Sequence, residues 1–454
     1  PLRRQLADEA TRKGIFEPAK AKENKEKVIP YIKGRFGDTN TEFVDLEWLN
    51  EEGLLSRVEQ CTAVKEEFTK QGVDAVFLIN CNFGNEEAAG QIAKMMNLPV
   101  LLWGPQDMVF EADGTRYTDA QCGLFAISKQ LRRQNIPFSY IENCQIEEEV
   151  FAEGMRQFLS VVCMVKNFKN LKVTQIGTRL NPFKSVMANE LEITEKFGIN
   201  ISTMNMTIMT EKLNRLLGEK SDKLETDLAR LKEQYDVAGL DDEVLKKMLT
   251  FVYAYREVFD DTNADVLLSE CWTCMPQAFE ANPCLAMSIL YDMGYIVTCE
   301  SDLHGAITQA ILQCASRGKA KPLFGEFTVR HPSNKNAELL WHCGQFAYSV
   351  HRSDKPCKCM NMRENFEAKS SHYTVARIDQ DHGKYSVIAG ECDSTEGPYT
   401  NGTYLWARFD NLDAWERKLI EGPYIHHVSE IEGSFTNEIK EFCKYVSNIK
   451  FETV

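Results

Sequence analysis

Residues 283–310 read PCLAMSILYDMGYIVTCESDLHGAITQA and hold the alternation that decides the fold. An apolar, helix-like stretch over 283–294 ends at a glycine, and the apolar run 295–297 follows it directly. That run gives way to polar residues, and a second helix-like stretch begins near Gly305. A buried strand between two helices is typical of a parallel sheet with both faces covered, so this stretch predicts an α/β fold.

The same alternation extends to both sides of this stretch. It predicts strands over 28–34, 74–84, 97–105, 136–142, 171–179, 199–209, 263–270 and 295–301. It predicts helices over 41–70, 84–97, 124–135, 187–198, 242–261 and 283–294, and a polar surface helix without a chemical role over 219–237. Strands that alternate with helices in this way indicate two doubly wound parallel-sheet domains, residues 1–170 and 171–319.

The pattern changes after about residue 320. Short alternating stretches follow, split by Gly, Pro, Asn and Asp, and no helix is predicted before Thr436. This pattern predicts a C-terminal antiparallel, β-barrel-like domain over residues 320–454. The predicted fold class is therefore α/β, with two doubly wound parallel-sheet domains followed by the C-terminal antiparallel β-barrel-like domain.

The composition is that of a globular protein and restricts its partners. The chain has 454 residues, of which 43% are hydrophobic and 26% charged, and its formal net charge is −15. Because a phosphate backbone would be repelled by this charge, nucleic acid is excluded as a general partner. No apolar run approaches the roughly 20 residues that cross a bilayer, and the first residues lack the apolar middle of a signal peptide. We therefore expect a cytoplasmic protein with no membrane association.

The fifteen cysteines are scattered along the chain, which is typical of a reduced protein whose cysteines are small buried apolar residues. Cys271 and Cys274 form a CxxC, and Cys357 and Cys359 form a CxC. A structural zinc site needs two such pairs at knuckle-like turns, and the first pair lies in an apolar segment without turn residues. These two motifs therefore predict no zinc site.

Carboxylates stand where two of the predicted strands end. Glu270 ends one strand, and Glu300 and Asp302 end the next. Ligands collect at the carboxyl ends of strands in open α/β sheets, and a crossover of ordinary length makes the two strands neighbours. Paired carboxylates bind a hard divalent cation, or act as acid and base in glycoside hydrolysis. The plainer alternative is that Asp302 or Ser301 only caps the following helix.

Histidine is the other candidate ligand, and the chain has only eight. His426 and His427 are adjacent in GPYIHHV, after a Gly-Pro turn. In an extended chain they point to opposite faces, so one of them can face a pocket. His304 is predicted on the first helical turn after Asp302, where packing or support of a ligand suits it better than ligation. His342 in WHCG is a further supporting candidate.

Several motifs together resemble the L-fucose isomerase family, part of the L-fucose/L-arabinose isomerase superfamily. They are LSECWTCMP around Glu270, CLAMSILYDMGYIVTCESDLHGA around Asp302, WHCG, GPYIHH with the Gly433 that follows, and GTRLNPF at 177–183. These motifs are scattered from about residue 171 to the end, and the first 165 residues match loosely through DTNTEFVD and NCNFGNEEAA. The resemblance implies two α/β domains and a C-terminal β-barrel-like domain.

Family members convert aldoses to ketoses with a divalent metal, usually manganese. Carried over to this chain, the resemblance implies Glu270, Asp302 and His427 as metal ligands, with His426 as the other candidate histidine. His427 is preferred because its distance to Gly433 matches the family spacing. The resemblance also implies Glu270 and Asp302 as the catalytic carboxylates, moving a proton through a cis-enediol. Members are homo-oligomers, so a trimer, tetramer or hexamer is expected.

The resemblance leaves the sugar open, because this chain is shorter than the enzymes that act on L-fucose. The expected substrate is a hexose, a deoxyhexose or a 6-substituted hexose, and some relatives convert sulfoquinovose to 6-deoxy-6-sulfofructose. The candidate substrate contacts are His426, Glu300, Arg35 and Arg179, and Arg116 and Arg330 also lie beside turns where a sulfonate could bind. A metal-assisted hydride shift is the alternative mechanism. The alternative function is a non-catalytic sugar-binding or regulatory protein on the same scaffold.

Overall fold

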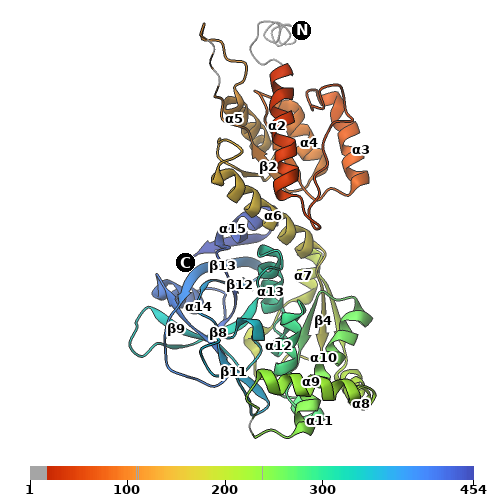
Figure 1. Ribbon diagram of the computed structural model, residues 1–454, viewed down its shortest axis with the longest axis vertical. Coiled ribbons are helices and arrows are strands. Elements are labelled where there is room, and N and C mark those ends of the chain that lie inside the picture. The colour runs from red at the N-terminus through yellow and green to blue at the C-terminus, as the bar shows by residue number, and fades with distance from the viewer. Residues whose placement is uncertain (1–17, 109, 111, 238) are drawn as a thin grey trace. The chain divides into compact units, whose positions relative to one another are not determined.

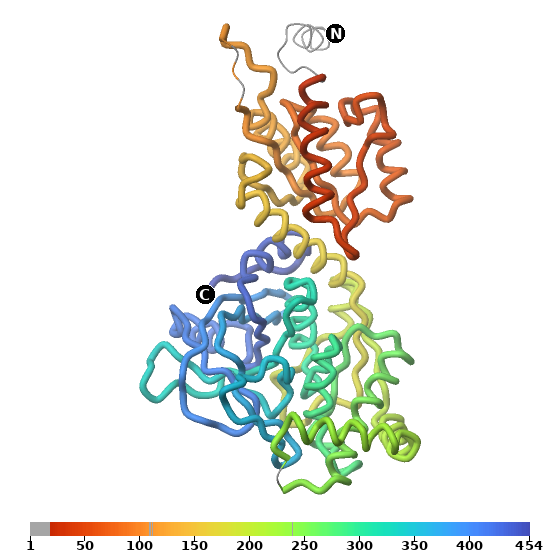
Figure 2. The backbone as a smooth tube through the Cα atoms, in the orientation of Figure 1, coloured from red at the N-terminus to blue at the C-terminus, as the bar shows by residue number. Residues whose placement is uncertain are grey.

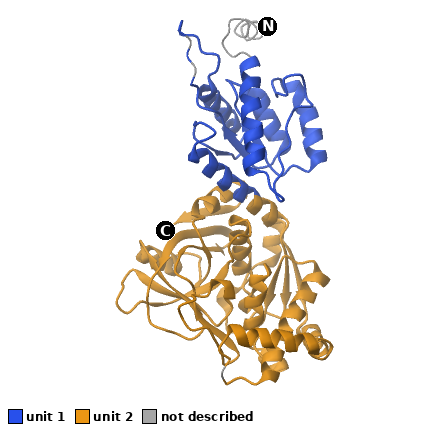
Figure 3. Cartoon of the chain, in the orientation of Figure 1, with its two compact units in different colours: residues 1–162 blue, residues 163–454 orange. Residues whose placement is uncertain are grey.

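The computed structural model describes residues 18–108, 110, 112–237 and 239–454. The chain divides into two compact units, one that extends to Val162 and one over Cys163–Val454 (Figure 3). The predicted domains 171–319 and 320–454 both lie within the second unit, and their boundary stays a prediction. No helix among the described residues combines the length and apolar character that crossing a membrane requires.

The first unit is built on a small parallel sheet covered by helices. Its strands are β1 (Val76–Ile79), β2 (Val100–Trp103) and β3 (Ser139–Tyr140), in the order β1-β2-β3. Its helices are α2 (Pro18–Phe36), α3 (Cys61–Gln71), α4 (Glu86–Met96) and α5 (Ala120–Arg133), with η1 (Val58–Gln60) before α3, and α6 (Glu149–Lys169) runs on into the second unit. The apolar strands β1 and β2 pair in parallel from Val76 and Val100 onward, as the alternating pattern predicts.

Two of the predicted elements in the first unit are wrong. The predicted strand over 28–34 lies inside α2, where Val28, Ile32 and Phe36 are buried at helical spacing. The spacing of four residues between buried side chains favours a helix, and it outweighs the strand propensity of the individual residues. The predicted helix over 41–70 is helical only from Val58, because the preceding residues form turns around Gly53 with a positive φ of 62°.

The second unit contains a four-stranded parallel sheet in the order β5-β4-β6-β7. Its strands are β5 (Asn200–Met204), β4 (Lys172–Ile176), β6 (Val266–Ser269) and β7 (Ile296–Thr298). The helices that accompany it are α7 (Glu190–Phe197), α8 (Met206–Glu219), α9 (Ser221–Gln234), α10 (Asp242–Thr262), α11 (Met275–Phe279), α12 (Cys284–Asp292) and α13 (Leu303–Ala315). The strands β6 and β7 pair directly, so the predicted neighbourhood of their carboxyl ends is confirmed.

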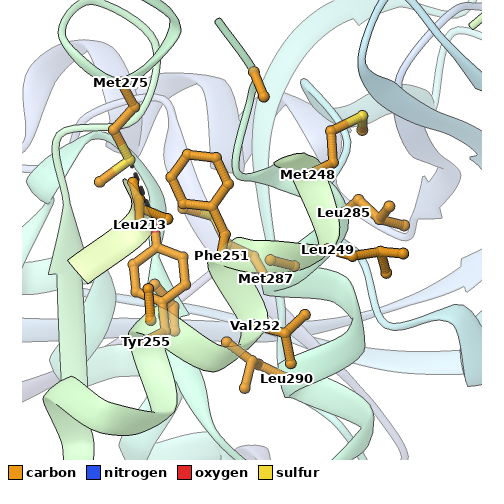
Figure 4. Close-up of a cluster of buried hydrophobic side chains, with 14 of the residues drawn as sticks. Leu213, Met248, Leu249, Phe251, Val252, Tyr255, Met275, Leu285, Met287 and Leu290 are labelled. Atoms are coloured by element: carbon orange, nitrogen blue, oxygen red, sulfur yellow. Dashed lines mark hydrogen bonds between the residues drawn. The ribbon is translucent and has the colours of Figure 1, made fainter. Parts of the chain in front are cut away.

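A large hydrophobic core lies beside this sheet, where α10 packs against α8, α9 and α12. Figure 4 shows Phe251, Tyr255, Leu285 and Leu290 converging in it. The predicted polar helix corresponds to α9, and its apolar stripe is also part of this core. A dry core of this size holds β6 and β7 in place and thereby fixes the strand ends that carry the candidate acids.

The remainder of the second unit is a nine-stranded mixed, largely antiparallel sheet in the order β10-β11-β14-β9-β8-β15-β12-β13-β16. Its strands are β8 (Leu323–Arg330), β9 (Ala337–His342), β10 (Lys358–Met360), β11 (Arg363–Glu367), β12 (His372–Asp381), β13 (Lys384–Ser394), β14 (Thr403–Phe409), β15 (His427–Glu432) and β16 (Ile449–Thr453). An additional pairing of β13 with β14 closes six of these strands into a ring, here called the β ring. The predicted α/β fold class is confirmed by these three sheets, and Figures 1 and 2 show the ring in cyan to blue.

Two helices accompany the β ring, α14 (Leu412–Glu421) and α15 (Thr436–Tyr445). The expectation that no helix precedes Thr436 is therefore wrong. Helix α14 begins where the Asn411 side chain accepts a hydrogen bond from the Ala414 amide, and it buries Leu412 and Trp415. In the sequence, the only indications of this helix are one Asx cap and two apolar positions. The same pattern is typical of a strand that ends in a turn.

Candidate metal centre

The link between β7 and α13 is a strained turn. Glu300 and Ser301 adopt positive φ angles of 61° and 53° in the short helix η3 (Cys299–Ser301). Side chains other than glycine rarely adopt this conformation, and it persists only where the surroundings impose it. The turn buries the Glu300 carboxylate, and Trp272 Nε1 donates a hydrogen bond of 3.0 Å to its Oε1. Strain at a buried acid is characteristic of functional sites.

Asp302 is fully buried and both of its carboxylate oxygens are engaged. Oδ1 caps α13 by accepting from the Gly305 amide at 3.0 Å. Arg377, on β12 of the β ring, donates to Oδ1 at 3.1 Å and to Oδ2 as well. Burial alone would raise the pKa of Asp302, but the Arg377 charge and the hydrogen bond from His427 lower that pKa well below its usual value. Asp302 is therefore a permanent anion at neutral pH.

His427 takes its orientation from Asp302. Its Nδ1 lies 3.0 Å from Asp302 Oδ2, and the ring is 1% exposed. Because the carboxylate is an anion, it accepts a hydrogen bond from the N–H group at Nδ1, and Nε2 points away from Asp302. Nε2 lies 3.2 Å from Glu300 Oε2 and 3.7 Å from Glu326 Oε2. A carboxylate behind a histidine in this way is the arrangement that orients metal-binding imidazoles.

The register of the β ring places Glu326 at the same centre. Strand β15 pairs antiparallel with β8, and His427 stands directly opposite Glu326. Burial raises the pKa of Glu326, whereas burial and the neighbouring His427 lower the pKa of His426 to about 4. His426 is therefore a neutral imidazole at neutral pH, able both to donate and to accept a hydrogen bond.

Two groups of donor atoms within 4.8 Å of one another share His427. One consists of Glu300, His342 and His427, and the other of Glu326, His426 and His427. Glu300 Oε2 and His427 Nε2 are both buried, and their contact with each other at 3.2 Å does not meet the geometry of a hydrogen bond. Buried polar atoms normally make well-formed hydrogen bonds, so two donor atoms that face each other in this way fit the ligands of a bound ion. Carboxylate oxygen and imidazole nitrogen together suit a divalent cation.

Glu270 lies at the carboxyl end of β6 and is held by threonines. Thr178 donates to Glu270 Oε2 from its amide at 2.8 Å and from its hydroxyl at 3.2 Å, and Thr273 donates to Oε1 at 3.1 Å. Gly177, with a φ of 78°, permits this close approach, because a Cβ there would lie 2.5 Å from Oε2. Ser301 Oγ also donates to the Thr178 carbonyl at 3.3 Å, which joins this edge to the Glu300 turn. Glu270 thus lies at the same sheet edge, outside the donor groups described above.

Among the candidate substrate contacts, Arg179 makes no hydrogen bond or ion pair with this centre within the described residues. Arg179 turns back on its own loop and donates to the carbonyls of Leu180 and Phe183 at 2.8 and 2.9 Å. Arg35 lies in the first unit, where its guanidinium is 3.7 Å from Glu149. The role of both arginines in substrate binding stays a prediction.

Sequence reasoning missed Arg377, Asp379 and Glu326. Arg377 also donates to Asp379 Oδ2 at 3.0 Å, and His304 Nδ1 lies 3.2 Å from Asp379 Oδ1. A buried row of hydrogen bonds and ion pairs therefore runs from His304 through Asp379, Arg377 and Asp302 to His427. Two charged residues at alternate positions of the apolar strand HYTVARID share one face, and that pattern was the available signal.

Buried carboxylates and imidazoles at the carboxyl edge of a parallel sheet define a candidate metalloenzyme site. Residues 10–169 match the model of the fucose/sulfoquinovose isomerase N-terminal domain. A sulfoquinovose isomerase of Priestia aryabhattai is 22% identical over 405 residues, which cover 87% of this chain and 89% of that protein. One from Alkalicoccus urumqiensis is 23% identical over 377 residues, covering 81% and 83%.

Residues 10–169 thus match the N-terminal domain of the fucose/sulfoquinovose isomerase family, and the chain is similar to sulfoquinovose isomerases over most of its length. The resemblance to the L-fucose isomerase family that the motifs indicate is thereby confirmed, and so is the assignment to the sugar isomerases. A third relative, the sulfoquinovose isomerase of a Clostridium species, is 25% identical over 278 residues, covering 61% of this chain and 60% of that protein.

Replacing Arg377 with methionine tests the buried row of charges. Arg377→Met leaves Asp302 and Asp379 buried without their counter-charge, and this should lower the free energy of unfolding by about 3–5 kcal/mol. Denaturant unfolding measures the loss. The matched control is Arg408→Met, since Arg408 pairs with Asp393 at the exposed surface of the same sheet and should cost roughly 0–1 kcal/mol. Equal losses in both variants would contradict the account.

Proposed function

We propose that the protein is a divalent-metal-dependent aldose–ketose isomerase acting on a hexose, a deoxyhexose or a 6-substituted hexose. The observation that carries the proposal is the buried pair of donor atoms Glu300 Oε2 and His427 Nε2, which face each other at 3.2 Å without a well-formed hydrogen bond. The names of the relatives favour sulfoquinovose as the sugar, with 6-deoxy-6-sulfofructose as the product. We also propose that the protein is a homo-oligomer, and the family resemblance alone supports this part of the proposal.

The ligand set that we propose differs in part from the one that the motifs imply. Glu300 and His427 would hold the metal with Glu326 beside them, because both carboxylates face Nε2 of His427, at 3.2 and 3.7 Å. Asp302 would orient His427, because Gly305, Arg377 and His427 already occupy its oxygens. Manganese is the proposed ion, since oxygen-rich sites with one imidazole suit hard divalent cations.

The remaining residues would carry the proton. When bound, the metal would supply a Lewis acid that stabilises negative charge on the sugar oxygens O1 and O2. Glu270 would take the proton from C2 and return it to C1, while a second proton passes from O2 to O1 through a cis-enediol. Thr178 and Thr273 fix the Glu270 carboxylate with three hydrogen bonds, which holds the base in one orientation. The neutral His426 would form hydrogen bonds with the sugar hydroxyls.

A panel of aldoses tests the proposed function. The panel contains L-fucose, D-arabinose, L-rhamnose, 6-deoxyglucose and sulfoquinovose, each with manganese and with a chelator. We expect ketose from sulfoquinovose with manganese, loss of turnover in chelator, and recovery when manganese is restored. Full activity after metal removal, or no ketose from any aldose, would overturn the proposal, and the second result would favour a non-catalytic sugar-binding protein. Deuterium at C2 should wash out into water, and complete retention at C1 would instead support a hydride shift.

Two carboxylate variants separate the proposed roles of Asp302 and Glu270. Asp302→Asn removes the anion behind His427 and should weaken manganese binding about 10–100-fold. Glu270→Gln should leave manganese affinity unchanged and lower kcat by roughly 10²–10⁴-fold, as loss of a positioned base does. Calorimetric titration of manganese and steady-state kinetics measure the two effects. Asp393→Asn, at a partly exposed acid of the β ring, is the control. Loss of manganese affinity in Glu270→Gln would show that Glu270 is a metal ligand, as the family resemblance implies.

A further inference from the structure

Four cysteines and one histidine form a buried sulfur cluster beside the candidate metal centre, and the proposed mechanism uses none of them. The cluster, so named below, consists of Cys271, Cys284, Cys299, Cys343 and His342. These residues come from the ends of β6, β7 and β9 and from the start of α12. All fifteen cysteines of the chain are free thiols. Neither sequence motif, CxxC or CxC, predicts this cluster, because its members converge only in the folded chain.

The spacing of three members of the cluster suits zinc ligands. The donor atoms of Cys299, His342 and Cys343 lie within 4.8 Å of one another. Cys343 Sγ is 3.4 Å from His342 Nδ1 and 4.0 Å from Cys284 Sγ. In a tetrahedral zinc site with Zn–S of about 2.3 Å and Zn–N of about 2.0 Å, neighbouring donors stand roughly 3.5–3.8 Å apart. Two sulfurs and one nitrogen, from Cys299, Cys343 and His342, therefore suit three positions of a tetrahedral zinc site, and Cys284 lies beside Cys343 as a further thiol.

Simple packing accounts for the cluster less well. A single buried cysteine needs no ligand, because it packs as a small apolar residue, as Cys359 and Cys392 do here. His342 differs, since it is 2% exposed and directs Nδ1 at a thiol. A disulfide between Cys271 and Cys299, whose Sγ atoms are 2.9 Å apart, is the competing outcome.

We propose that Cys299, Cys343 and His342 form a second metal site, with Cys284 beside them as the further thiol, and that this site is selective for a soft divalent ion such as zinc. Thiolates prefer zinc over magnesium or manganese, whereas the carboxylates of the neighbouring centre have the opposite preference. The chain would therefore sort two metals between adjacent sites by the softness of their ligands. His342 belongs to a donor group of each site, so bound zinc would also fix the orientation of an imidazole that lines the candidate manganese centre.

Cobalt(II) reports on the proposed site directly. The full chain is stripped of metal under reducing conditions, saturated with manganese, and titrated with cobalt. We expect one equivalent of cobalt to give intense sulfur-to-cobalt charge transfer and the strong visible bands of a tetrahedral ion. Zinc should abolish these bands, and further manganese should not. Cys343→Ser and Cys299→Ser should lose them, whereas Cys274→Ser, the CxxC partner outside the cluster, should keep them.

Three results would overturn the proposal. The first is the absence of a charge-transfer band in wild-type protein whose thiols are all reduced, and the second is the survival of the bands in both cluster variants. The third is a Cys271–Cys299 disulfide, found by mass spectrometry in the protein as purified. If the serine variants fail to fold, X-ray absorption at the zinc edge of the wild-type protein decides. A shell of sulfur at about 2.3 Å supports the site, and a shell of oxygen and nitrogen alone rejects it. Isomerase activity is assayed separately, so failure here is distinguishable from failure of the proposed function.

Discussion

The buried ion pair between Arg377 and Asp302 joins the two sheets of the second unit. Arg377 belongs to the β ring, and Asp302 begins the helix that follows the parallel sheet (Figure 1). Both side chains are fully buried, so removing either charge would leave its partner uncompensated in a poorly solvating interior. This mutual dependence fixes the distance between ring and sheet at the point where the candidate ligands meet.

The rest of the centre follows from that fixed point. Because Nδ1 of His427 donates a hydrogen bond to Asp302, the imidazole can present only Nε2 to the interior. The antiparallel register then brings Glu326 opposite His427, and the strained turn after β7 brings Glu300. Each of the three donors comes from a different element, so the centre exists only when ring and sheet are assembled. Local strain at Glu300 is affordable because the surrounding core is closely packed.

The sequence was sufficient for the parts of this arrangement that depend on local pattern. Apolar runs between helices predicted the parallel sheet, the neighbouring strands β6 and β7, and acids at their carboxyl ends. The pattern did not predict which oxygen faces which nitrogen. That outcome depends on the register of β8 with β15 and on Arg377, about 75 residues after Asp302, and neither leaves a periodic signal near the acids. Long-range pairing of this kind is decided by assembly of the whole unit.

The division of roles between Glu300 and Asp302 is the central claim, and a crystal structure of the manganese-loaded protein tests it most directly. Anomalous scattering would place the ion independently of any assumption about its ligands. The account predicts manganese bound to Glu300 and to His427 Nε2, with Asp302 still paired to Arg377. Manganese bound to Asp302, with Arg377 displaced, would contradict it.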